Sequence, residues 1–386
     1  MLYLDNAATS FPKPQEVIDA ITIALNAPAS PGRSGHKPAL EASRVVYRAR
    51  KAIAKLFGIG NLERVAFTPN ITWAINIALG GIGLKAYDHV LSSALEHNST
   101  ARPLALLAEK NIITWETVAP GPDGLLRAED FASKLKPNTR LVVLCHGSNV
   151  TGALAPAKAI KEAIGEVPIL LDLAQTAGAM PLEDLGSWAD IITFTGHKGL
   201  LGPTGTGGLY LKEGIGFQPL AVGGTGSRSE SLSQPDFLPD ALEAGTLNTH
   251  GLAGLAAGVN YLLEKGLDKV REHELNLVSV FLEDISKISK LSILGPGPGI
   301  LQRVSTVSLN IEGWSSSDLA GALEAEYGIM TRSGLHCSPL AHKAMGTFPG
   351  GAVRFSFGLF NTLEEARLAA KALEELSKRK TARKKS

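Results

Sequence analysis

Residues 191–208, IITFTGHKGLLGPTGTGG, constrain the fold more than any other stretch of this chain. An apolar, β-branched run, 191–194, predicts a buried strand, and the glycine-rich turn that follows carries Lys198 directly behind His197. In α/β proteins, ligands bind where strands pass into loops at the carboxyl edge of the sheet. A lysine there, among glycines that let a bulky ligand approach the backbone, is a candidate for Schiff-base chemistry. These residues alone leave a solvated surface lysine open as the alternative.

Short apolar segments alternate with helical patterns over the first half of the chain. Strands are predicted at 65–68, 89–92, 112–116, 141–145, 169–171 and 191–194, and helices at 15–25, 40–57, 72–79, 103–110, 128–135 and 156–164. This alternation indicates an α/β protein with a mostly parallel sheet covered by helices on both faces. A glycine-, serine- and proline-rich segment, 223–239, is too long for an ordinary connection and predicts either a functional loop or a disordered one.

A second, smaller α+β domain is predicted toward the C-terminus. Its elements are helices at 267–289, 316–327 and 363–378 and strands near residue 293 and at 304–310. A chain of 386 residues exceeds what one hydrophobic core usually supports. We therefore predict a large domain of residues 15–263, a small domain of residues 264–376 joined by residues 1–14, and a basic tail, 377–386.

Composition places the chain among ordinary globular proteins, with 44% hydrophobic and 19% charged residues. The two cysteines, Cys145 and Cys337, cannot build a disulfide framework, and no charged-then-apolar leader precedes Leu4, so a reducing, cytoplasmic setting is expected. No apolar run reaches the roughly 18 residues of a membrane span, so no membrane role is expected. The tail carries six lysines and arginines and predicts a disordered, solvated end. No basic patch elsewhere supports nucleic-acid binding.

Polar residues follow three of the predicted strands. His97 comes after LSSALE, Asn149 after LVVLCHGS, and Asp172 and Gln175 lie in LDLAQ. Taken singly, each has a structural interpretation, as a hydrogen-bonded loop histidine, an Asx turn or a helix cap. Their joint placement at the same sheet edge as Lys198 favours a functional site.

Lys198, Asp172 and His97 together suit pyridoxal 5′-phosphate. This cofactor needs a lysine to hold it as a Schiff base and a carboxylate to keep the pyridine nitrogen protonated. It also needs a flat group over the ring, for which the imidazole of His97 is suited. Phosphate donors are expected at Ile71, Thr72, Thr195 and His197, with Gln175 donating to the phenolic oxygen. No metal ligand set is predicted.

Eight motifs occur along the chain in the order YLDNAAT, EHNSTARPL, SNVTG, LDLAQ, TGHKGLLGPTGTGGLY, EAGT, RSGLHC and VRFSFGLFNT. With them the chain resembles, over nearly its whole length, the class V, aminotransferase-fold cysteine desulfurases, in particular their selenocysteine lyase-like branch. The resemblance implies fold type I of the pyridoxal-phosphate-dependent transferases. It also implies that Lys198 forms the Schiff base, that Asp172 partners the pyridine nitrogen, that Gln175 and His97 contact the ring, and that Thr72, Thr195 and His197 bind the phosphate.

The same resemblance implies roles on the substrate side. Arg354 resembles the arginine that binds the substrate carboxylate, and Asn149 and Arg332 match neighbouring positions. Cys337 matches the cysteine that carries a persulfide, whereas Cys145 is expected to be a buried hydrophobic residue. Thr246 resembles a threonine that reaches the phosphate of a neighbouring subunit, so a homodimer with composite sites is expected.

The expected activity is the conversion of L-cysteine to L-alanine. Lys198 would remove the Cα proton, and Cys337 would attack the substrate sulfur and carry it as a persulfide. A protein sulfur acceptor is among the expected partners. Three alternatives remain open on the sequence. They are a selenocysteine lyase acting on L-selenocysteine, another class V reaction (transamination or β-elimination) without a role for Cys337, and a non-catalytic scaffold, against which the intact Lys198 argues.

Overall fold

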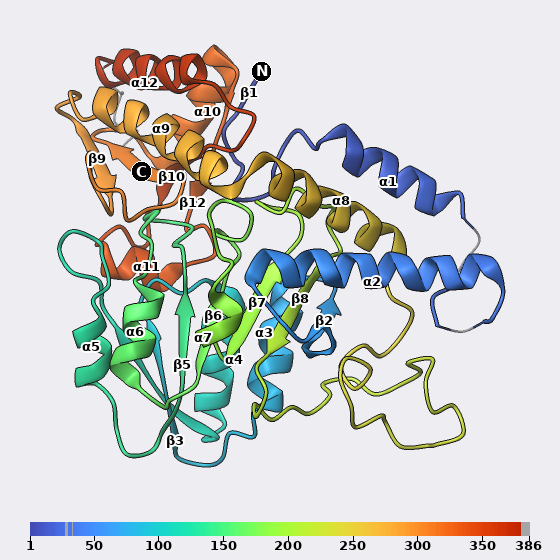
Figure 1. The fold of residues 1–386 in the computed structure, drawn as a ribbon. Helices are drawn as coiled ribbons and strands as arrows, with labels where there is room; N and C mark the ends of the chain where they lie inside the picture. The colour runs from blue at the N-terminus through green and yellow to red at the C-terminus, as the bar shows by residue number, and fades with distance from the viewer. Residues whose placement is uncertain (28–29, 33, 380–386) are drawn as a thin grey trace.

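A seven-stranded sheet forms the centre of the larger region in the computed structural model, which describes residues 1–27, 30–32 and 34–379 (Figure 1). The strands are β2 (Val65–Thr68), β3 (Asp88–Ser93), β4 (Ile113–Val118), β5 (Thr139–Cys145), β6 (Ile169–Asp172), β7 (Ile191–Thr195) and β8 (Gly207–Leu211), in the order β2-β8-β7-β6-β5-β3-β4. Only β8 runs antiparallel to its neighbours. The predicted, mostly parallel sheet is confirmed.

Each strand sends alternate side chains into two cores, one on each face of the sheet. In β5, Val142 and Leu144 enter one core and Leu141 and Val143 the other, and all four are fully buried. The first face is covered by α2 (Lys37–Phe57), α5 (Ala128–Ser133), α6 (Ala157–Ile164), α7 (Leu185–Trp188) and α8 (Thr249–Lys265), and the second by α3 (Ile71–Gly81) and α4 (Asn98–Glu109). Burying each such side chain contributes about 1.5–3 kcal/mol, so the apolar strands commit the chain to a covered sheet.

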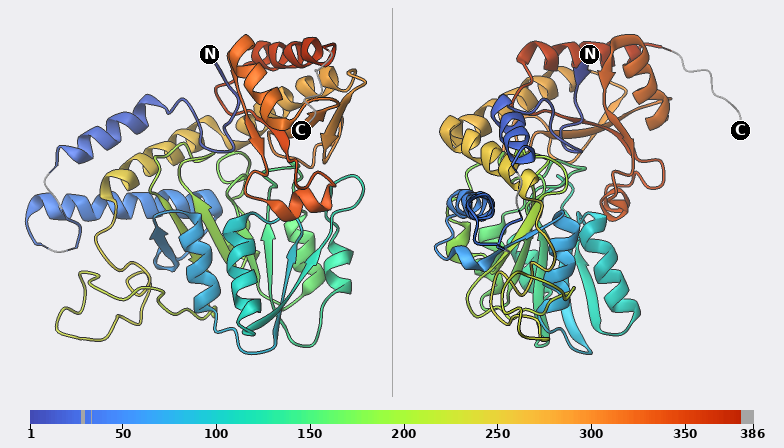
Figure 2. Two further views of the ribbon diagram at one scale, coloured as in Figure 1. Left: turned by 180° about the vertical axis from the view of Figure 1, so that it is seen from behind. Right: turned by 90° about the vertical axis from the view of Figure 1, so that its right-hand side faces the viewer.

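A four-stranded antiparallel sheet organises the smaller region. It contains β9 (Leu291–Leu294), β10 (Thr306–Ile311), β12 (Arg332–Gly334) and β13 (Ala352–Ser356), in the order β12-β13-β10-β9, with α9 (Leu267–Ile285), α10 (Ser316–Tyr327), α11 (Pro339–Ala344) and α12 (Leu363–Ser377). A short parallel pair joins β1 (Leu2–Tyr3) to β11 (Ile329–Met330). Leu4 enters the core of this region beside Phe281 and Phe355, and Figure 2 shows the N-terminus beside these elements. The division at residue 264 itself stays a prediction.

The remaining helices, α1 and η1, belong to the N-terminal part of the chain. Helix α1 (Gln15–Leu25) lies along α8 (Figure 1), and η1 (Leu62–Arg64) leads into β2. Gly266, with φ +87°, separates α8 from α9. Only glycine adopts such a backbone conformation without strain, so the chain can turn there from the larger region into the smaller one.

The glycine-rich run after Lys198 contains a strand that the sequence does not predict. Residues 207–208 were interpreted as part of the turn, but they begin β8 and pair with both β2 and β7. A Cβ atom at Gly208 would lie 2.6 Å from the carbonyl oxygen of Ala66 and equally close to the ring of Phe194. Glycine is therefore needed for the close approach of strands, rather than for a loop.

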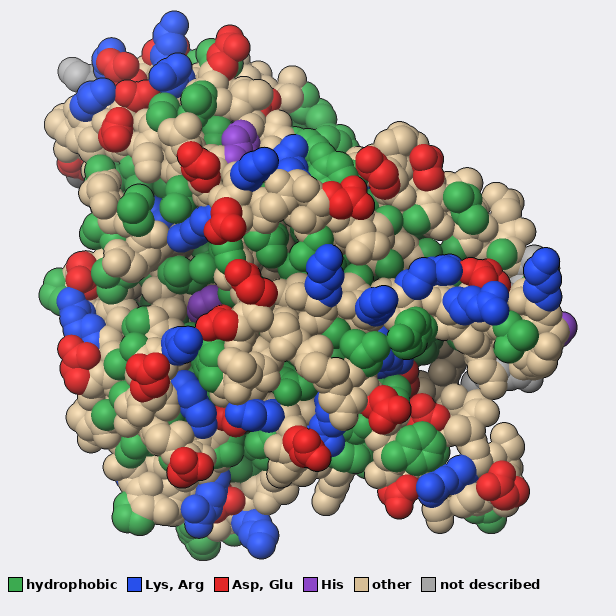
Figure 3. Space-filling view, in the orientation of Figure 1, with side chains coloured by type: hydrophobic (Ala, Val, Ile, Leu, Met, Phe, Trp, Pro, Cys, Tyr) green, Lys and Arg blue, Asp and Glu red, His purple; other side chains and the backbone are tan. Residues whose placement is uncertain are grey.

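Residues 212–248 connect β8 to α8 without a helix or strand and extend away from the sheet (Figure 1). Figure 3 shows the surface hollowed between this segment and α2, where a pocket of about 170 Å³ is lined by Ser43, Val46 and Thr225. Glu243 anchors the end of the segment, because its carboxylate forms a buried ion pair with Arg50 at 2.9 Å. The segment predicted as a functional or disordered loop, 223–239, lies within this connection, and Arg228 pairs with Asp236 inside it at 2.9 Å.

The first residues of the predicted tail, 377–379, are described by the structure. Helix α12 ends at Ser377, and Arg379 pairs with Glu326 at 2.7 Å. Residues 380–386, the rest of the predicted tail, lie outside the described residues. Among the helices that the structure describes, none combines the length and apolar character needed to cross a membrane.

Candidate active site

Three of the predicted site residues gather at the carboxyl edge of the large sheet. Because β3, β5, β6 and β7 run parallel, the segments that follow them meet at one edge, and Cys145, Asp172 and Thr193 stand level on three neighbouring strands. Asp172 and His97 both lie close enough to the ammonium of Lys198 to shift their pKa values. The predicted meeting of these side chains is present in the structure.

Lys198 follows β7 and sits half-buried above this edge. Burial lowers the pKa of its amine from 10.5 to about 8, and the charge of Asp172 opposes this shift. The backbone is fixed from the N-terminal segment, because the Ser10 hydroxyl donates to the Lys198 carbonyl at 2.7 Å. A fixed, partly neutral amine is what condensation with a carbonyl compound needs.

The lowered pKa predicts how Lys198 reacts with a carbonyl compound as pH changes. Since the neutral amine is the nucleophile, its reaction rate should rise with pH and level off above about 8 rather than near the usual 10.5. The measurement is the rate at which pyridoxal phosphate becomes attached to Lys198 between pH 6 and 10. Borohydride reduction traps the adduct, which is quantified on the Lys198 peptide, and Lys198→Ala is the blank. A rate that keeps rising to pH 10 would contradict the lowered pKa.

Asp172 ends β6 with its carboxylate buried. Its Oδ1 accepts a hydrogen bond from the Ala174 backbone N–H at 2.9 Å, and the Ser99 hydroxyl lies 3.5 Å from Oδ2. Burial raises the pKa of the carboxyl, while Lys198 counteracts the rise. A second cation at Oδ2, such as a protonated pyridine nitrogen, would favour the charged carboxylate further.

His97 caps helix α4, which begins at Asn98 rather than at the predicted Pro103. The prediction failed because proline usually opens a helix, whereas Pro103 lies in the second turn of this one. The Ser99 backbone N–H donates to Nδ1 of His97 at 3.0 Å, so the proton of the neutral ring sits on Nε2. Burial, and then the charge of Lys198, lowers the pKa of His97 to about 4. The site therefore holds a neutral, flat imidazole.

The expected phosphate seat combines the start of α3 with the turn before Lys198. Ile71 and Thr72 open the helix, and the Thr72 side chain is exposed there, while Asn70 caps the helix through its side chain. A Cβ atom at Gly207 would lie 2.8 Å from the Asn70 backbone. Only glycine therefore lets β8 approach this helix end, whose free N–H groups suit an anion.

Thr195 and His197 flank the same turn. Thr195 ends β7, is buried, and lies 3.5 Å from the Thr206 carbonyl. Among the described residues, the buried Nδ1 of His197 has no hydrogen-bond partner. An unpaired buried nitrogen fits a polar ligand such as phosphate.

Gln175 faces the N-terminal segment, which the sequence did not link to the site. Its amide Nε2 donates to the Ala7 carbonyl at 3.1 Å. Thr9 and Lys13 in the same segment donate to the His197 carbonyl, both at 3.0 Å. The N-terminal segment therefore holds the backbone of the turn that carries Lys198.

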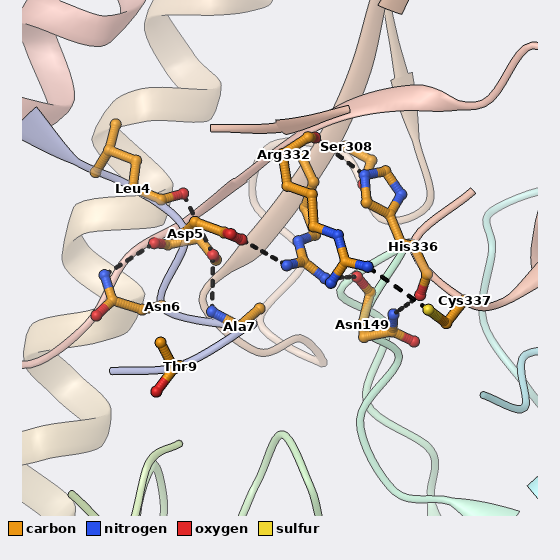
Figure 4. A network of polar contacts seen from close by, with 12 residues as sticks. Leu4, Asp5, Asn6, Ala7, Thr9, Asn149, Ser308, Arg332, His336 and Cys337 are labelled. Carbon is orange, nitrogen blue, oxygen red and sulfur yellow. Dashed lines mark hydrogen bonds and ion pairs between the residues drawn. The ribbon is translucent and has the colours of Figure 1, made fainter. Parts of the chain in front are cut away.

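Arg354 lies on β13 and is buried, and Asp5 forms an ion pair with its Nη2 at 2.6 Å. The Nη1 donates to the Asn149 carbonyl at 3.3 Å, and Nε has no partner among the described residues. Asp5 and Asn149 lie on opposite sides of the arginine side chains (Figure 4). Burial lowers the pKa of Arg354, and Asp5 opposes the shift. The guanidinium is thus held in place with N–H groups left for an anionic ligand. Asp5 was missed because it is distant in sequence.

Cys337 is exposed on a tight turn between β12 and α11. His336 and Cys337 have φ values of 51° and 57°, in the left-handed region, where each costs about 1–3 kcal/mol. Arg332 points back to the turn, with its Nη2 3.5 Å from the Cys337 sulfur (Figure 4). The Arg332 guanidinium is thus the charged group that lies beside the sulfur.

Asn149 holds this turn with both ends of its amide. Its Nδ2 donates to the His336 carbonyl and its Oδ1 accepts from the Ser338 hydroxyl, each at 2.8 Å. The Asn98 backbone N–H, at the start of α4, donates to the Cys337 carbonyl at 2.7 Å. These bonds tie the turn to the large region, and a substrate role for Asn149 stays a prediction.

Thr246 is exposed on the segment before α8, away from hydrogen-bond partners within the described part of the chain. It lines a pocket of about 360 Å³ together with Pro69, Trp73, Leu220 and Asn248. Pro69 and Trp73 bracket the start of α3, so this largely apolar pocket opens next to the expected phosphate seat. No group of three or more metal-ligating side chains occurs in the described residues.

Pyridoxal phosphate fits this set of groups. The structure offers a buried amine with a lowered pKa in Lys198, a buried carboxylate in Asp172, and a neutral ring in His97. The unpaired Nδ1 of His197 and the open start of α3 supply donors for a phosphate.

Comparisons with known proteins give the family and the fold of the chain. The family model "Aminotransferase class-V" matches residues 2–368. The chain is 32% identical to a probable cysteine desulfurase of Methanothermobacter thermautotrophicus, over 97% of this chain and 94% of that protein. It is 33% identical to one of Pyrococcus abyssi, over 98% and 94%. An apo cysteine desulfurase from Thermococcus onnurineus NA1 superposes with a TM-score of 0.90 at 32% identity, over 98% of this chain and 94% of that one.

Proposed function

Because the chain belongs to the class V aminotransferase-fold cysteine desulfurase family, we propose that it converts L-cysteine to L-alanine and carries the sulfur as a persulfide on Cys337. The main support is the position of the Cys337 turn. Its backbone is hydrogen bonded to Asn149 and to the first residue of α4, the helix that His97 caps. A turn on the small region is thereby held over the edge that carries Lys198.

The residues of the site divide the work of this reaction. Lys198 and Asp172 would hold pyridoxal 5′-phosphate, with Gln175 and His97 against its ring and Ile71, Thr72, Thr195 and His197 at its phosphate. When bound, this cofactor supplies an electron sink for bonds at the substrate Cα. Lys198, with a pKa of about 8, is suited to move a proton at that carbon near neutral pH.

Cys337 and Arg354 would act on the substrate itself. Arg354 binds the carboxylate through N–H groups not engaged by Asp5 and Asn149. The Cys337 thiolate attacks the substrate sulfur, so that a sulfur–sulfur bond forms as the Cβ–sulfur bond breaks. Lys198 returns a proton to the carbon skeleton, and the products are alanine and the enzyme persulfide. Exposure of Cys337 leaves the outer sulfur accessible to a sulfur acceptor.

A homodimer completes this proposal. Thr246, Trp73 and Leu220 are exposed around a largely apolar pocket beside the start of α3. A second copy placed there would cover this surface and bring its Thr246 toward the phosphate seat, which is the composite site that the family resemblance implies. We also assign residues 15–263 and 264–376 with 1–14 to two domains. The free thiols Cys145 and Cys337 suit a reducing compartment such as the cytoplasm.

Replacing Arg354 with lysine tests the carboxylate site. We expect KM for L-cysteine to rise roughly 10- to 100-fold, since a point charge replaces two charge-assisted hydrogen bonds. Alanine and sulfide formed by wild type and Arg354→Lys are measured against L-cysteine concentration. Cysteamine, which lacks the carboxylate, serves as control and should show no difference between the two proteins. An unchanged KM for L-cysteine would place its carboxylate elsewhere.

A further inference from the structure

Two buried histidines, His336 and His342, stand behind the Cys337 turn. His336 immediately precedes the cysteine, and His342 lies in α11. Their side chains are 2% and 0% exposed, their rings are stacked with centroids 5.4 Å apart, and His336 Nδ1 lies 3.3 Å from His342 Nε2. Neither imidazole has a part in the proposed reaction. Buried imidazoles need partners, so their hydrogen bonds indicate what they hold.

The donor and acceptor of each hydrogen bond made by the two histidines follow from the Arg332 carbonyl, which can only accept. His336 Nε2 lies 3.0 Å from the Arg332 carbonyl, which can only accept, so Nε2 carries the proton. In a neutral His336 ring, Nδ1 must then accept, and His342 Nε2–H is its donor. His342 Nδ1 accepts in turn from the Thr347 hydroxyl at 2.8 Å. A single directed chain runs from Thr347 through both rings to β12.

This chain of hydrogen bonds fixes the turn that presents the Cys337 thiol. His336 reaches back to Arg332, and so closes a short loop whose two left-handed residues are His336 and Cys337. Asn149 and the Asn98 N–H hold the turn through the His336 and Cys337 carbonyls. The hydrogen-bond chain through the rings is a second, separate support, which reaches the turn from α11. A backbone in a disfavoured conformation persists only where its surroundings fix it.

We propose that His342 is a positioning residue for Cys337, donating its Nε2–H to His336 and thereby holding the turn in the conformation that delivers the thiol. The proposal rests on the proposed role of Cys337 and adds a residue to that site. Arg332 makes two contacts with the turn. Its carbonyl accepts a hydrogen bond from His336, and its Nη2 lies near the cysteine sulfur. Displacing His336 would therefore disturb both the thiol and the cation beside it.

Burial keeps both rings neutral, which preserves the direction of these hydrogen bonds. Burial, and then the nearby Arg354, lowers the pKa of His336 to about 3. Burial also lowers the pKa of His342. Both rings are therefore neutral near pH 7, so each keeps one donor and one acceptor.

Four variants test this assignment. His342→Gln keeps an N–H in the position of Nε2, whereas His342→Asn places its amide nearer Nδ1 and loses the donor to His336. His342→Leu removes both functions. His89→Leu is the matched control, because His89 is also fully buried and hydrogen bonded to a threonine, Thr139, at 2.8 Å, but lies in β3 away from the turn. Melting temperatures of all four show any general loss of stability.

Two measurements separate positioning from packing. Hydrogen exchange of the peptide spanning 331–345 reports on the turn, in which the Ser338 N–H bonds the Leu335 carbonyl at 2.9 Å. We expect exchange there to accelerate at least about tenfold in His342→Leu and His342→Asn, the equivalent of one lost hydrogen bond. We expect kcat for alanine to fall on the order of 10- to 100-fold in the same variants, with KM unchanged. His342→Gln and His89→Leu should match wild type in both.

The outcomes distinguish this proposal from the proposed function. If wild type forms no alanine from L-cysteine, the proposed function fails, whereas the exchange data still report on the turn. If wild type is active and His342→Leu retains kcat despite faster exchange, His342 only packs, and the positioning role is wrong. A His342→Gln variant as impaired as His342→Leu would also overturn it, since the donated hydrogen would then not be what matters.

Discussion

Lys198→Ala is expected to form no detectable alanine from L-cysteine, a loss on the order of 10⁴-fold or more, because positioned proton transfer alone contributes up to about that much. The variant also loses the nucleophile that anchors pyridoxal phosphate, so the purified protein should lack the yellow absorbance of the lysine-bound cofactor. The Lys198 side chain is half-buried and its ammonium is poorly solvated. Its removal should therefore leave the fold intact.

Absorbance spectra and an alanine assay on wild type and Lys198→Ala measure both effects. Lys13→Ala is a matched control, since burial lowers the pKa of Lys13 to about 8 as well, while its ammonium only donates to Ser10 and the His197 carbonyl. Lys13→Ala should keep the absorbance. Yellow absorbance that survives in Lys198→Ala would overturn the assignment of the cofactor site.

Cys337→Ala is expected to lose the protein-bound sulfane sulfur entirely and to form alanine from L-cysteine at least about 100-fold more slowly. The positioned thiol acts at an effective concentration that a millimolar external thiol cannot match. Cofactor absorbance should be unaffected, because Cys337 lies on the small region and contacts none of the residues assigned to the cofactor ring.

Sulfane sulfur released by cyanide, together with alanine, is measured for wild type, Cys337→Ala and the matched control Cys145→Ala. Cys145 is buried and its thiol donates to the Gly147 carbonyl at 3.0 Å, so its loss should leave both products unchanged. L-Selenocysteine provides a second arm, because selenium leaves carbon more readily. Full activity of Cys337→Ala on L-cysteine would favour simple β-elimination, and full activity on L-selenocysteine alone would favour a lyase.

The residues that sequence predicted best are those fixed by strand order. His97, Asp172 and Lys198 each follow an apolar strand, and parallel strands bring their carboxyl ends together whatever the loops do. The alternation of short apolar segments with helical segments likewise made the covered sheet predictable. These features depend on local pattern and on one topological rule.

The contacts that sequence missed depend on residues far apart in the chain. Asp5 and Arg354 are 349 positions apart, and no local pattern reveals that a buried arginine has an aspartate partner. Asn149 was predicted as a substrate residue, yet its amide is engaged by the Cys337 turn, which only the packing of the two regions determines. Strand β8 was missed for another reason, because its leading glycines are required for close strand contact rather than for a turn.

The pairing of β1 with β11 has a consequence for the order in which the enzyme is made. Leu2 and Tyr3 leave the ribosome long before their partners Ile329 and Met330. The central sheet can therefore assemble before Leu2 and Tyr3 find their partners, since domains generally fold as units during translation. Asp5 meets Arg354 only once the last strand is complete. Until then a partly synthesised chain contains Lys198 and Asp172 but no paired Arg354, so the proposed sulfur transfer cannot begin before the small region is complete.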